Sequence, residues 1–444
     1  MVNIRSIGVP MATVLMFASL IILLIMGMRL AFLTGFVAMF FAFCWFGPNV
    51  FGVLTSQIYG FVGKQESLMA VPMFVLMASL LDKTGIARDF YNGMQRLVGR
   101  IKGGVAVQTM IVAIILAATS GIIGGETVLL GLLALPQMLR LGYDKKLAIG
   151  TVCAGGSLGT MVPPSIVLII YGMVANVSIG DLFTAAIFPA LLLATMYIIY
   201  ILVLCNIKPE MGPVNDEKLP KLNSNEKWLL LFHIMGPLLI VASVMGSIYG
   251  GIASVTEAAS VGVFAVLILA VIRREFTKQV VSDSLKQTMK TCGMIIWIGI
   301  SASMLIGVYN LMGGKKFVEG LILGLDVQPH IIILMMMLIL IFLGMFMDWI
   351  GVAMLTMPIF VPIIIGLGFS PIWFGVLFCM NMQVSFLSPP FGPAAFYLKS
   401  VAPPEISLID IFKSVWPFII MQIIAISILI IFPNLALWLP SLGG

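Results

Sequence analysis

Long apolar stretches with few charged residues are the feature that most restricts what this chain can fold into. Hydrophobic residues make up 61% of the 444 and charged residues only 9%, which is too few to cover a soluble globule. The sequence therefore predicts an all-α polytopic membrane protein and excludes soluble enzyme folds and disordered chains. Ten segments are long enough to cross a bilayer core of about 30 Å, near residues 11–28, 32–55, 68–82, 146–172, 182–207, 228–249, 254–272, 291–313, 371–398 and 414–432.

Two further apolar stretches, 103–139 and 329–366, are interrupted near their middles by glycines and a carboxylate. The limbs of the first stretch span only about 18–20 Å each at 1.5 Å per residue, so they cannot cross. The limbs of the second are longer, and its turn lies around Asp348. We expect two re-entrant helical hairpins that enter from opposite sides, because irregular backbone at midplane depth needs protein or water around it.

A span with an internal break follows each hairpin. The breaks contain Pro163-Pro164 within 146–172 and Pro389-Pro390 within 371–398. Consecutive prolines remove backbone donors and end a helix, and Ser388 is placed to cap the half-helix that follows. In each span we expect two half-helices that meet in the membrane, with free carbonyls for a cation and free amides for an anion.

The two halves of the chain repeat this order of segments. The proline pairs are 226 residues apart, and the polar linker 208–227 separates a first repeat at 1–207 from a second at 228–444. Each half has five predicted crossings, an odd number, so the repeats should be inverted relative to one another. Inverted repeats with discontinuous helices indicate a secondary transporter.

Basic residues support this topology. If neither hairpin crosses, 20 of the 24 lysines and arginines fall on the cytoplasmic side, as expected from the positive-inside rule. Both termini then face the periplasm. The basic segments 83–102 and 273–290 are expected to lie along the cytoplasmic membrane surface as amphipathic helices.

Three carboxylates remain inside the predicted membrane region: Glu126, Glu257 and Asp348. Glu257 completes a capping box with Ser254 at a helix start. Glu126 and Asp348 lie at the hairpin turns, where they can cap the second limb, line an ion or substrate pathway, or do both. We find no catalytic constellation, so an enzyme is not expected, whereas an ion channel with re-entrant loops remains an alternative.

Several motifs resemble those of a known family, the large membrane (M) subunit of tripartite ATP-independent periplasmic (TRAP) transporters. They include Thr119-Ser120-Gly121, the run 159–166, the run 178–183, Thr256-Glu257-Ala258-Ala259 and Ser388-Pro389-Pro390. The resemblance implies an elevator-type, sodium-driven importer of small organic acid anions in the inner membrane. It also implies two partners, a small four-helix membrane (Q) subunit and a periplasmic substrate-binding (P) protein. A self-sufficient sodium/anion symporter of the same superfamily is the alternative within transport.

The resemblance also implies where ions and substrate bind. Two or more sodium ions would use the hairpin tips and the broken spans, with metal-site residues Ser120, Gly121, Gly156, Ser157, Gly159, Gly344, Met345, Asp348, Ser385 and Ser388. The substrate-site residues would be Glu126, Thr127, Thr160, Pro163, Ser165, Gly351, Pro389 and Gly392. At Ile122 and Phe386 this sequence departs from the family pattern, so carbonyl oxygens could replace side-chain ligands there. The sequence does not identify which organic acid is carried.

Overall fold

The chain folds into a bundle of helices in the computed structural model, which describes residues 7–63, 66–98, 101–121, 124–214, 223–324 and 327–442. Across these ranges no strand occurs, as the sequence predicts. The same ranges contain five short 3-10 helices beside the α-helices: η2 (Pro48–Val50), η3 (Glu66–Met69), η4 (Leu158–Thr160), η5 (Pro209–Met211) and η6 (Pro440–Leu442). The α-helices are α1 (Gly8–Ile25), α2 (Leu30–Phe46), α3 (Phe51–Gly63), α4 (Ala70–Lys83), α5 (Ile86–Val98), α6 (Gly104–Ser120), α7 (Gly125–Arg140), α8 (Lys145–Ser157), α9 (Ile166–Ala175), α10 (Ile179–Ile207), α11 (Ser224–Tyr249), α12 (Val255–Ile272), α13 (Lys278–Leu311), α14 (Gly314–Leu323), α15 (Pro329–Phe346), α16 (Trp349–Gly366), α17 (Pro371–Leu387), α18 (Pro393–Lys399), α19 (Leu408–Ile431) and α20 (Asn434–Leu437).

Seven of the helices in the described ranges are long and apolar enough to cross a membrane by themselves: α10, α11, α12, α13, α15, α16 and α19. An eighth crossing is possible if α4 and α5, which are bent by 60° at their junction, form one span. Lipid offers no partner for an exposed backbone group, so a chain made of such helices is suited to a bilayer. The predicted multi-pass membrane protein is confirmed.

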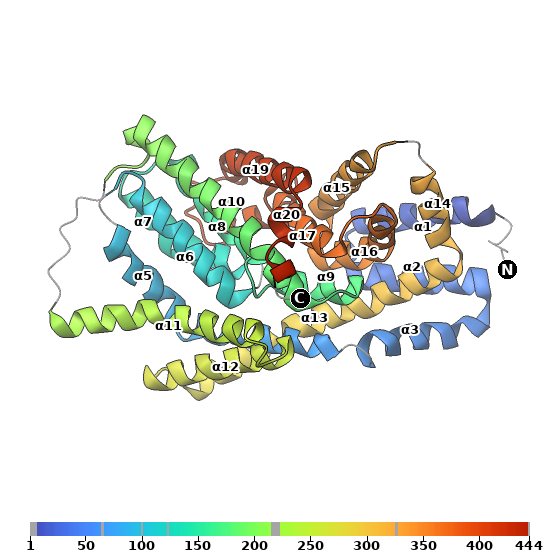
Figure 1. The fold of residues 1–444 in the computed structure, drawn as a ribbon, viewed down its shortest axis with the longest axis horizontal. Helices are drawn as coiled ribbons and strands as arrows, with labels where there is room; N and C mark the ends of the chain where they lie inside the picture. Colours follow the sequence, from blue (N-terminus) through green and yellow to red (C-terminus); the bar gives the residue numbers. More distant parts are fainter. Residues whose placement is uncertain are drawn as a thin grey trace.

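The helices are arranged in two regions. In Figure 1, α3, α11, α12 and α13 run along the lower edge, whereas both hairpins and the interrupted helices occupy the part above them. Helix α13 packs against α2, α3 and α4 on one side and against α16 on another. Helix α8 packs against α6, α7 and α19, and α17 packs against α15 and α19. This places α8 and α17 at the centre of the upper region.

The interrupted helices form the core. Every residue from Leu147 to Ser157 in α8 and from Trp373 to Leu387 in α17 is buried. Small residues allow this close packing, since a Cβ at Gly150 would lie only 2.6 Å from the Ser414 carbonyl oxygen. A helix that is buried on all sides has no lipid-facing stripe, which explains why neither helix is amphipathic.

The predicted helix pairs and breaks lie where the sequence places them. Helices α6 and α7 form the first hairpin, and α15 and α16 form the second. Helix α8 is separated from α9 by η4 and an irregular segment, and α17 is separated from α18 by residues 388–392. The peptide bonds Pro163-Pro164 and Pro389-Pro390 are both cis.

Three details differ from expectation. Residues 278–290 are not a separate surface helix, because α13 continues without a break from Lys278 to Leu311. The expected span 32–55 ends at Phe46, where Gly47 and a proline stop the helix before α3 begins. Ser388 does not cap the following half-helix, since its Oγ donates backward to the Val384 carbonyl at 2.7 Å and α18 begins five residues later.

The capping box predicted at Glu257 is confirmed. The backbone amide of Ser254 donates to Oε2 of Glu257 at 2.7 Å, and the Ser254 hydroxyl accepts from the amide of Glu257. These bonds satisfy backbone donors that a helix start leaves without an intrahelical partner. Glu257 therefore has a structural role at the start of α12.

Candidate functional site

The tip of the first hairpin packs directly on the first interrupted helix. The Ile166 amide donates to the Gly121 carbonyl at 3.4 Å, and a Cβ at Gly121 would lie 2.7 Å from the Pro164 carbonyl oxygen. Gly121 also has a φ of +56°, a left-handed conformation that favours glycine. The chain needs a glycine here for two separate reasons, the backbone conformation and the close approach.

The second limb of this hairpin makes two more glycine contacts. A Cβ at Gly159 would lie 2.8 Å from Oε1 of Glu126, and one at Gly156 would lie 2.9 Å from the Cα of Thr127. Glu126 and Thr127 are both buried. The carboxylate predicted at the hairpin turn therefore lies against η4, directly after the glycine-rich end of α8, in the region predicted to bind the first sodium ion.

The other predicted residues of this region are buried and bonded locally. The Ser165 hydroxyl donates to the Thr160 carbonyl at 2.5 Å, and the Thr160 hydroxyl donates to the Ser157 carbonyl at 3.0 Å. Ser157 contacts α19, since its Oγ lies 3.4 Å from Nε2 of Gln422. Pro163, which lies between Thr160 and Ser165 in the sequence, is also buried. Of Ser120, only the backbone at the end of α6 is described.

The second hairpin and the second interrupted helix meet through a similar contact. A Cβ at Gly344 would lie 2.5 Å from Oγ of Ser385, whose hydroxyl is 3.3 Å from the Ile341 carbonyl of the same hairpin. Gly351, in contrast, faces Leu30 of α2. Met345 is half-buried, Pro389 is partly exposed, and Gly392 is buried against the backbone of the break.

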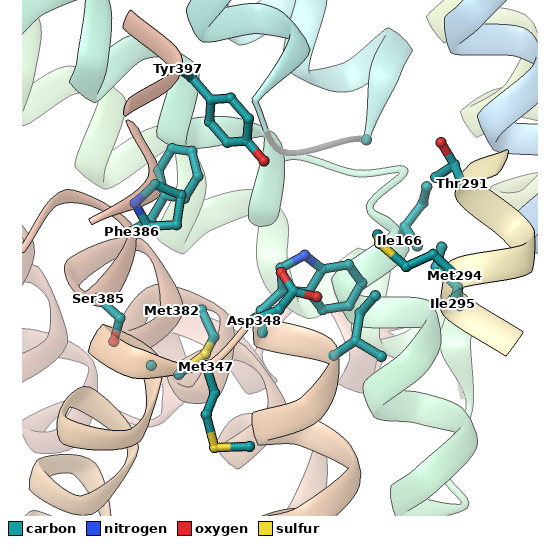
Figure 2. A pocket seen from close by; sticks show the side chains of 15 residues that line it. Ile166, Thr291, Met294, Ile295, Met347, Asp348, Met382, Ser385, Phe386 and Tyr397 are labelled. Atoms are coloured by element: carbon teal, nitrogen blue, oxygen red, sulfur yellow. The ribbon is translucent and has the colours of Figure 1, made fainter. Parts of the chain in front are cut away.

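A cavity of about 110 Å³ lies where these elements converge. Both hairpin tips contribute to its wall through Gly121, Gly344 and Asp348, and α17 contributes Ser385. Figure 2 shows Asp348 and Tyr397 directed into this space, with side chains of α13 on the opposite side. The structure thus brings together four of the predicted site residues around one cavity. The full lining is Gly121, Ile166, Thr291, Met294, Ile295, Gly344, Met347, Asp348, Trp349, Ile350, Met382, Ser385, Phe386, Pro393 and Tyr397.

Asp348 is the one charged residue in that lining, and its side chain is exposed to the cavity. The remaining polar side chains in the wall are Thr291, Ser385, Tyr397 and the indole of Trp349. An anion that entered this cavity by itself would meet one negative charge and no lysine or arginine. The side chains of the described wall therefore supply no positive charge that would balance an anion.

A second cavity, of about 580 Å³, lies beside the first. Its wall includes Glu126 at the first hairpin tip and Asp82 and Lys83 at the end of α4. We call this second space the vestibule, and the smaller one the tip cavity. Glu126, predicted as a substrate residue, therefore faces the vestibule and not the tip cavity.

Nearly the whole sequence matches one protein family. The model of "Tripartite ATP-independent periplasmic transporter, DctM component" matches residues 11–435. This chain belongs to the DctM family. The match covers both hairpins and both interrupted helices, so the resemblance drawn from the motifs is confirmed. A DctM component is one part of a tripartite periplasmic transporter, and such proteins are permeases, not enzymes.

Individual DctM relatives are similar along nearly their whole length. The chain is 29% identical over 455 residues to the C4-dicarboxylate TRAP transporter large permease protein DctM of Vibrio cholerae, covering 97% of this chain and 98% of that one. It is 31% identical over 446 residues to the ectoine TRAP transporter large permease protein TeaC of Halomonas elongata, covering 97% and 99%. The crystal structure of the Alcanivorax borkumensis YdaH transporter shares the fold, with a TM-score of 0.64 at 15% identity over 88% of each chain.

Sequence reasoning missed the α13 and α18 residues of this DctM-family site. Thr291, Met294 and Ile295 line the tip cavity from a helix that was expected only to cross the membrane. Tyr397 follows the second proline pair by seven residues and was read as part of a span. Thr291 is a polar residue within the predicted span 291–313. Its polarity is the one feature of the sequence that could have indicated a place in the site.

Proposed function

We propose that this chain is the translocating subunit of a sodium-coupled secondary importer of small organic acid anions, delivered by a periplasmic binding protein. The convergence of both hairpin tips and an interrupted helix on the tip cavity carries this proposal. Interrupted helices present free backbone amides and carbonyls, which is the usual way transporters hold ions and polar solutes inside a bilayer. Membership of a tripartite transporter family supports the same function.

Sodium coupling follows from the charge of the tip cavity. Asp348 repels an anion, and the cavity wall supplies no basic side chain. Sodium ions at the tip contacts would provide the missing positive charge, using carbonyl and hydroxyl oxygens near Gly121 and Ser385. Because ion and substrate then stabilise one another, each should tighten the binding of the other by the same factor.

We further propose that the two halves, 1–207 and 228–444, are inverted repeats joined by the linker 208–227. The recurring order of hairpin, interrupted helix and long helix supports this assignment. In this topology both termini are periplasmic and both hairpins are re-entrant, so α15 and α16 would not cross although each is long enough to do so. The hairpins and interrupted helices would move as one body against α3, α11, α12 and α13, in an elevator motion.

The partners follow from the same proposal. The chain would act in the inner membrane with a small four-helix membrane (Q) subunit and a periplasmic substrate-binding (P) protein. The relatives' names include C4-dicarboxylate and ectoine transporters, so the substrate of this chain is left at the class of small organic acids. Selection among them would rest with the binding protein.

Reconstitution tests this proposal and its alternatives together. Proteoliposomes with an inward sodium gradient should take up the substrate only when the chain, the Q subunit and the loaded P protein are all present. The rate should rise sigmoidally with sodium, at about two ions or more per substrate, and potassium should not replace it. Uptake by the chain alone would favour the self-sufficient symporter. Ion currents without substrate would favour the channel.

A further inference from the structure

Three residues belong to the walls of both cavities: Thr291, Met294 and Tyr397. In the part of the chain that the structure describes, the tip cavity and the vestibule therefore share a wall, with α13 on one side and α18 on the other. The first hairpin also reaches both spaces, since Gly121 lines the tip cavity and Gly124 lines the vestibule. A solute that moved between the two spaces along this shared wall would pass these side chains.

The Tyr397 ring packs against the backbone of Gly124 at the first hairpin tip. A Cβ at Gly124 would lie 2.7 Å from Cε2 and 2.8 Å from Cζ of this ring. Gly124 has a φ of +101°, so glycine is required both for the conformation and for the ring contact. Figure 2 shows the Tyr397 hydroxyl directed toward the space above Asp348. The aromatic ring thus covers the hairpin tip and extends into the passage.

Neighbouring contacts hold Tyr397 in this position. A Cβ at Gly131 would lie 2.8 Å from Cδ1 of Leu398, so α18 packs closely on the second limb of the first hairpin. The Phe386 ring lies 6.2 Å from the Tyr397 ring, centroid to centroid. A tyrosine side chain has only two rotatable bonds to its ring, so a ring with these neighbours can adopt few positions.

The side chains on the opposite side of the passage are more flexible. Met294 is 54% exposed, and a methionine side chain has three rotatable bonds and adapts its shape to what is beside it. Thr291, one helical turn away, has a short side chain. Tyr397 is itself 41% exposed, so the difference between the two sides lies in the ring's volume, its fewer rotatable bonds and its contact with Gly124.

We propose that Tyr397 sets the size limit for solutes that pass between the tip cavity and the vestibule. This makes Tyr397 a specificity-determining residue, and it rests on the proposed function insofar as the solute is the transported substrate. The hydroxyl contributes less than the ring, because the limit comes from the volume that the ring occupies. Replacing the ring by a small side chain should widen the passage without altering the hairpin backbone.

Thiol labelling measures this limit without transport. Met347 lines the tip cavity alone and Leu132 lines the vestibule alone, so Met347→Cys and Leu132→Cys report on the two spaces. The full-length purified chain is treated with ethylammonium or ethyltrimethylammonium methanethiosulfonate, which carry the same charge and differ in bulk. Labelling of the chain without a reporter is subtracted, because Cys44 is only half-buried.

The smaller reagent should label Met347→Cys faster than the bulkier one by about tenfold or more, relative to Leu132→Cys. Tyr397→Ala should bring the two rates together, whereas Tyr397→Phe should preserve the difference. Phe396→Ala is the matched control, since Phe396 is a neighbouring exposed aromatic residue outside both cavity walls. Tyr397→Leu replaces Tyr397→Ala if the alanine variant aggregates.

Three results would overturn the proposal: equal labelling by both reagents with Tyr397 intact, an unchanged ratio in Tyr397→Ala, or the same change in Phe396→Ala. Failure to label Met347→Cys in every variant would also count against it, since the passage would then lie elsewhere. These outcomes are separate from the test of transport, because labelling requires neither a sodium gradient nor a partner. If the reconstituted system took up substrate but Tyr397→Ala left the ratio of the two labelling rates unchanged, the proposed transport function would stand and the proposed role of Tyr397 would be wrong.

Discussion

Replacement of Gly121 by alanine should separate the first hairpin tip from the first interrupted helix. The new Cβ would lie 2.7 Å from the Pro164 carbonyl oxygen, a backbone atom that cannot rotate away. A left-handed conformation costs a non-glycine residue about 1–2 kcal/mol. Overpacking costs about 1–3 kcal/mol more. The packed tip should therefore lose about 2–5 kcal/mol, which is at least roughly 30-fold in its population relative to an unpacked tip.

Gly125→Ala is the matched control for this variant. Gly125 lies at the same tip, at the start of α7, and a Cβ there would meet no atom within 4 Å. Alanine is favoured over glycine in a helix by about 0.5–1 kcal/mol, so this variant should be as stable as the parent or slightly more stable.

The assay is thermal unfolding of the purified protein against sodium concentration, with potassium keeping the ionic strength constant. Gly121→Ala should unfold at a lower temperature and should need more sodium for half of the sodium-dependent stabilisation, because the apparent affinity falls with the fraction of the protein that holds the tip in the binding geometry. Gly125→Ala should follow the parent curve. If both variants gave the same curve, the argument from close approach at Gly121 would be refuted.

Three other experiments probe the ions, the tip contact and the topology. Asp348→Asn should weaken the sodium dependence of uptake more than Glu257→Gln, because Glu257 is occupied by its capping box and should cost only about 0.5–2 kcal/mol of stability when changed; equal effects would contradict a sodium role for Asp348. Gly159→Val should abolish uptake with little loss of expression, since its side chain would overlap the first hairpin's carboxylate; retained uptake would show that this contact is dispensable. A cysteine at Gln328 should react with an impermeant thiol reagent from outside the cell and one at Asn223 should not, and external labelling at position 223 would contradict the inverted repeats.

Breaks in the helices could be predicted from sequence because their causes are local. The stretch expected to form the first hairpin, 103–139, is occupied by α6 and α7, and the proline pairs lie between helices in both interrupted spans. Glycine in a left-handed conformation and proline without an amide end a helix through their own backbone chemistry. No knowledge of distant residues is needed for this inference.

Side-chain directions at the site could not be predicted in the same way. Gly351 was expected to face the substrate and lies against Leu30 of α2, while Ser388 bonds to the helix before it. Tyr397 becomes part of the cavity wall only because α18 packs on the first hairpin, more than 260 residues earlier in the chain. These facts depend on how distant helices pack, which helix periodicity and break positions do not encode.

The continuity of α13 has a different explanation. Lys286 and Lys290 mark where a membrane surface could lie, and from this the sequence was read as a surface helix followed by a span. Lysine is a good helix former, so charge determines where a helix sits and does not determine where it ends. Neither proline nor glycine separates residues 278–292, and the helix accordingly continues through them.

This uninterrupted helix makes the site sensitive to the lipid around it. At 1.5 Å per residue the 34 residues of α13 extend about 51 Å, far more than the hydrocarbon thickness of about 30 Å. The charged part with Lys278, Lys286 and Lys290 is suited to project beyond the hydrocarbon core, and the apolar remainder, 291–311, adjusts its tilt to the thickness of the bilayer. Thr291 and Met294 lie near the middle of the rod, so a change in its tilt moves one wall of the passage relative to Tyr397. We therefore expect the transport rate to depend on acyl-chain length in the surrounding bilayer, even where no residue that contacts the solute is changed.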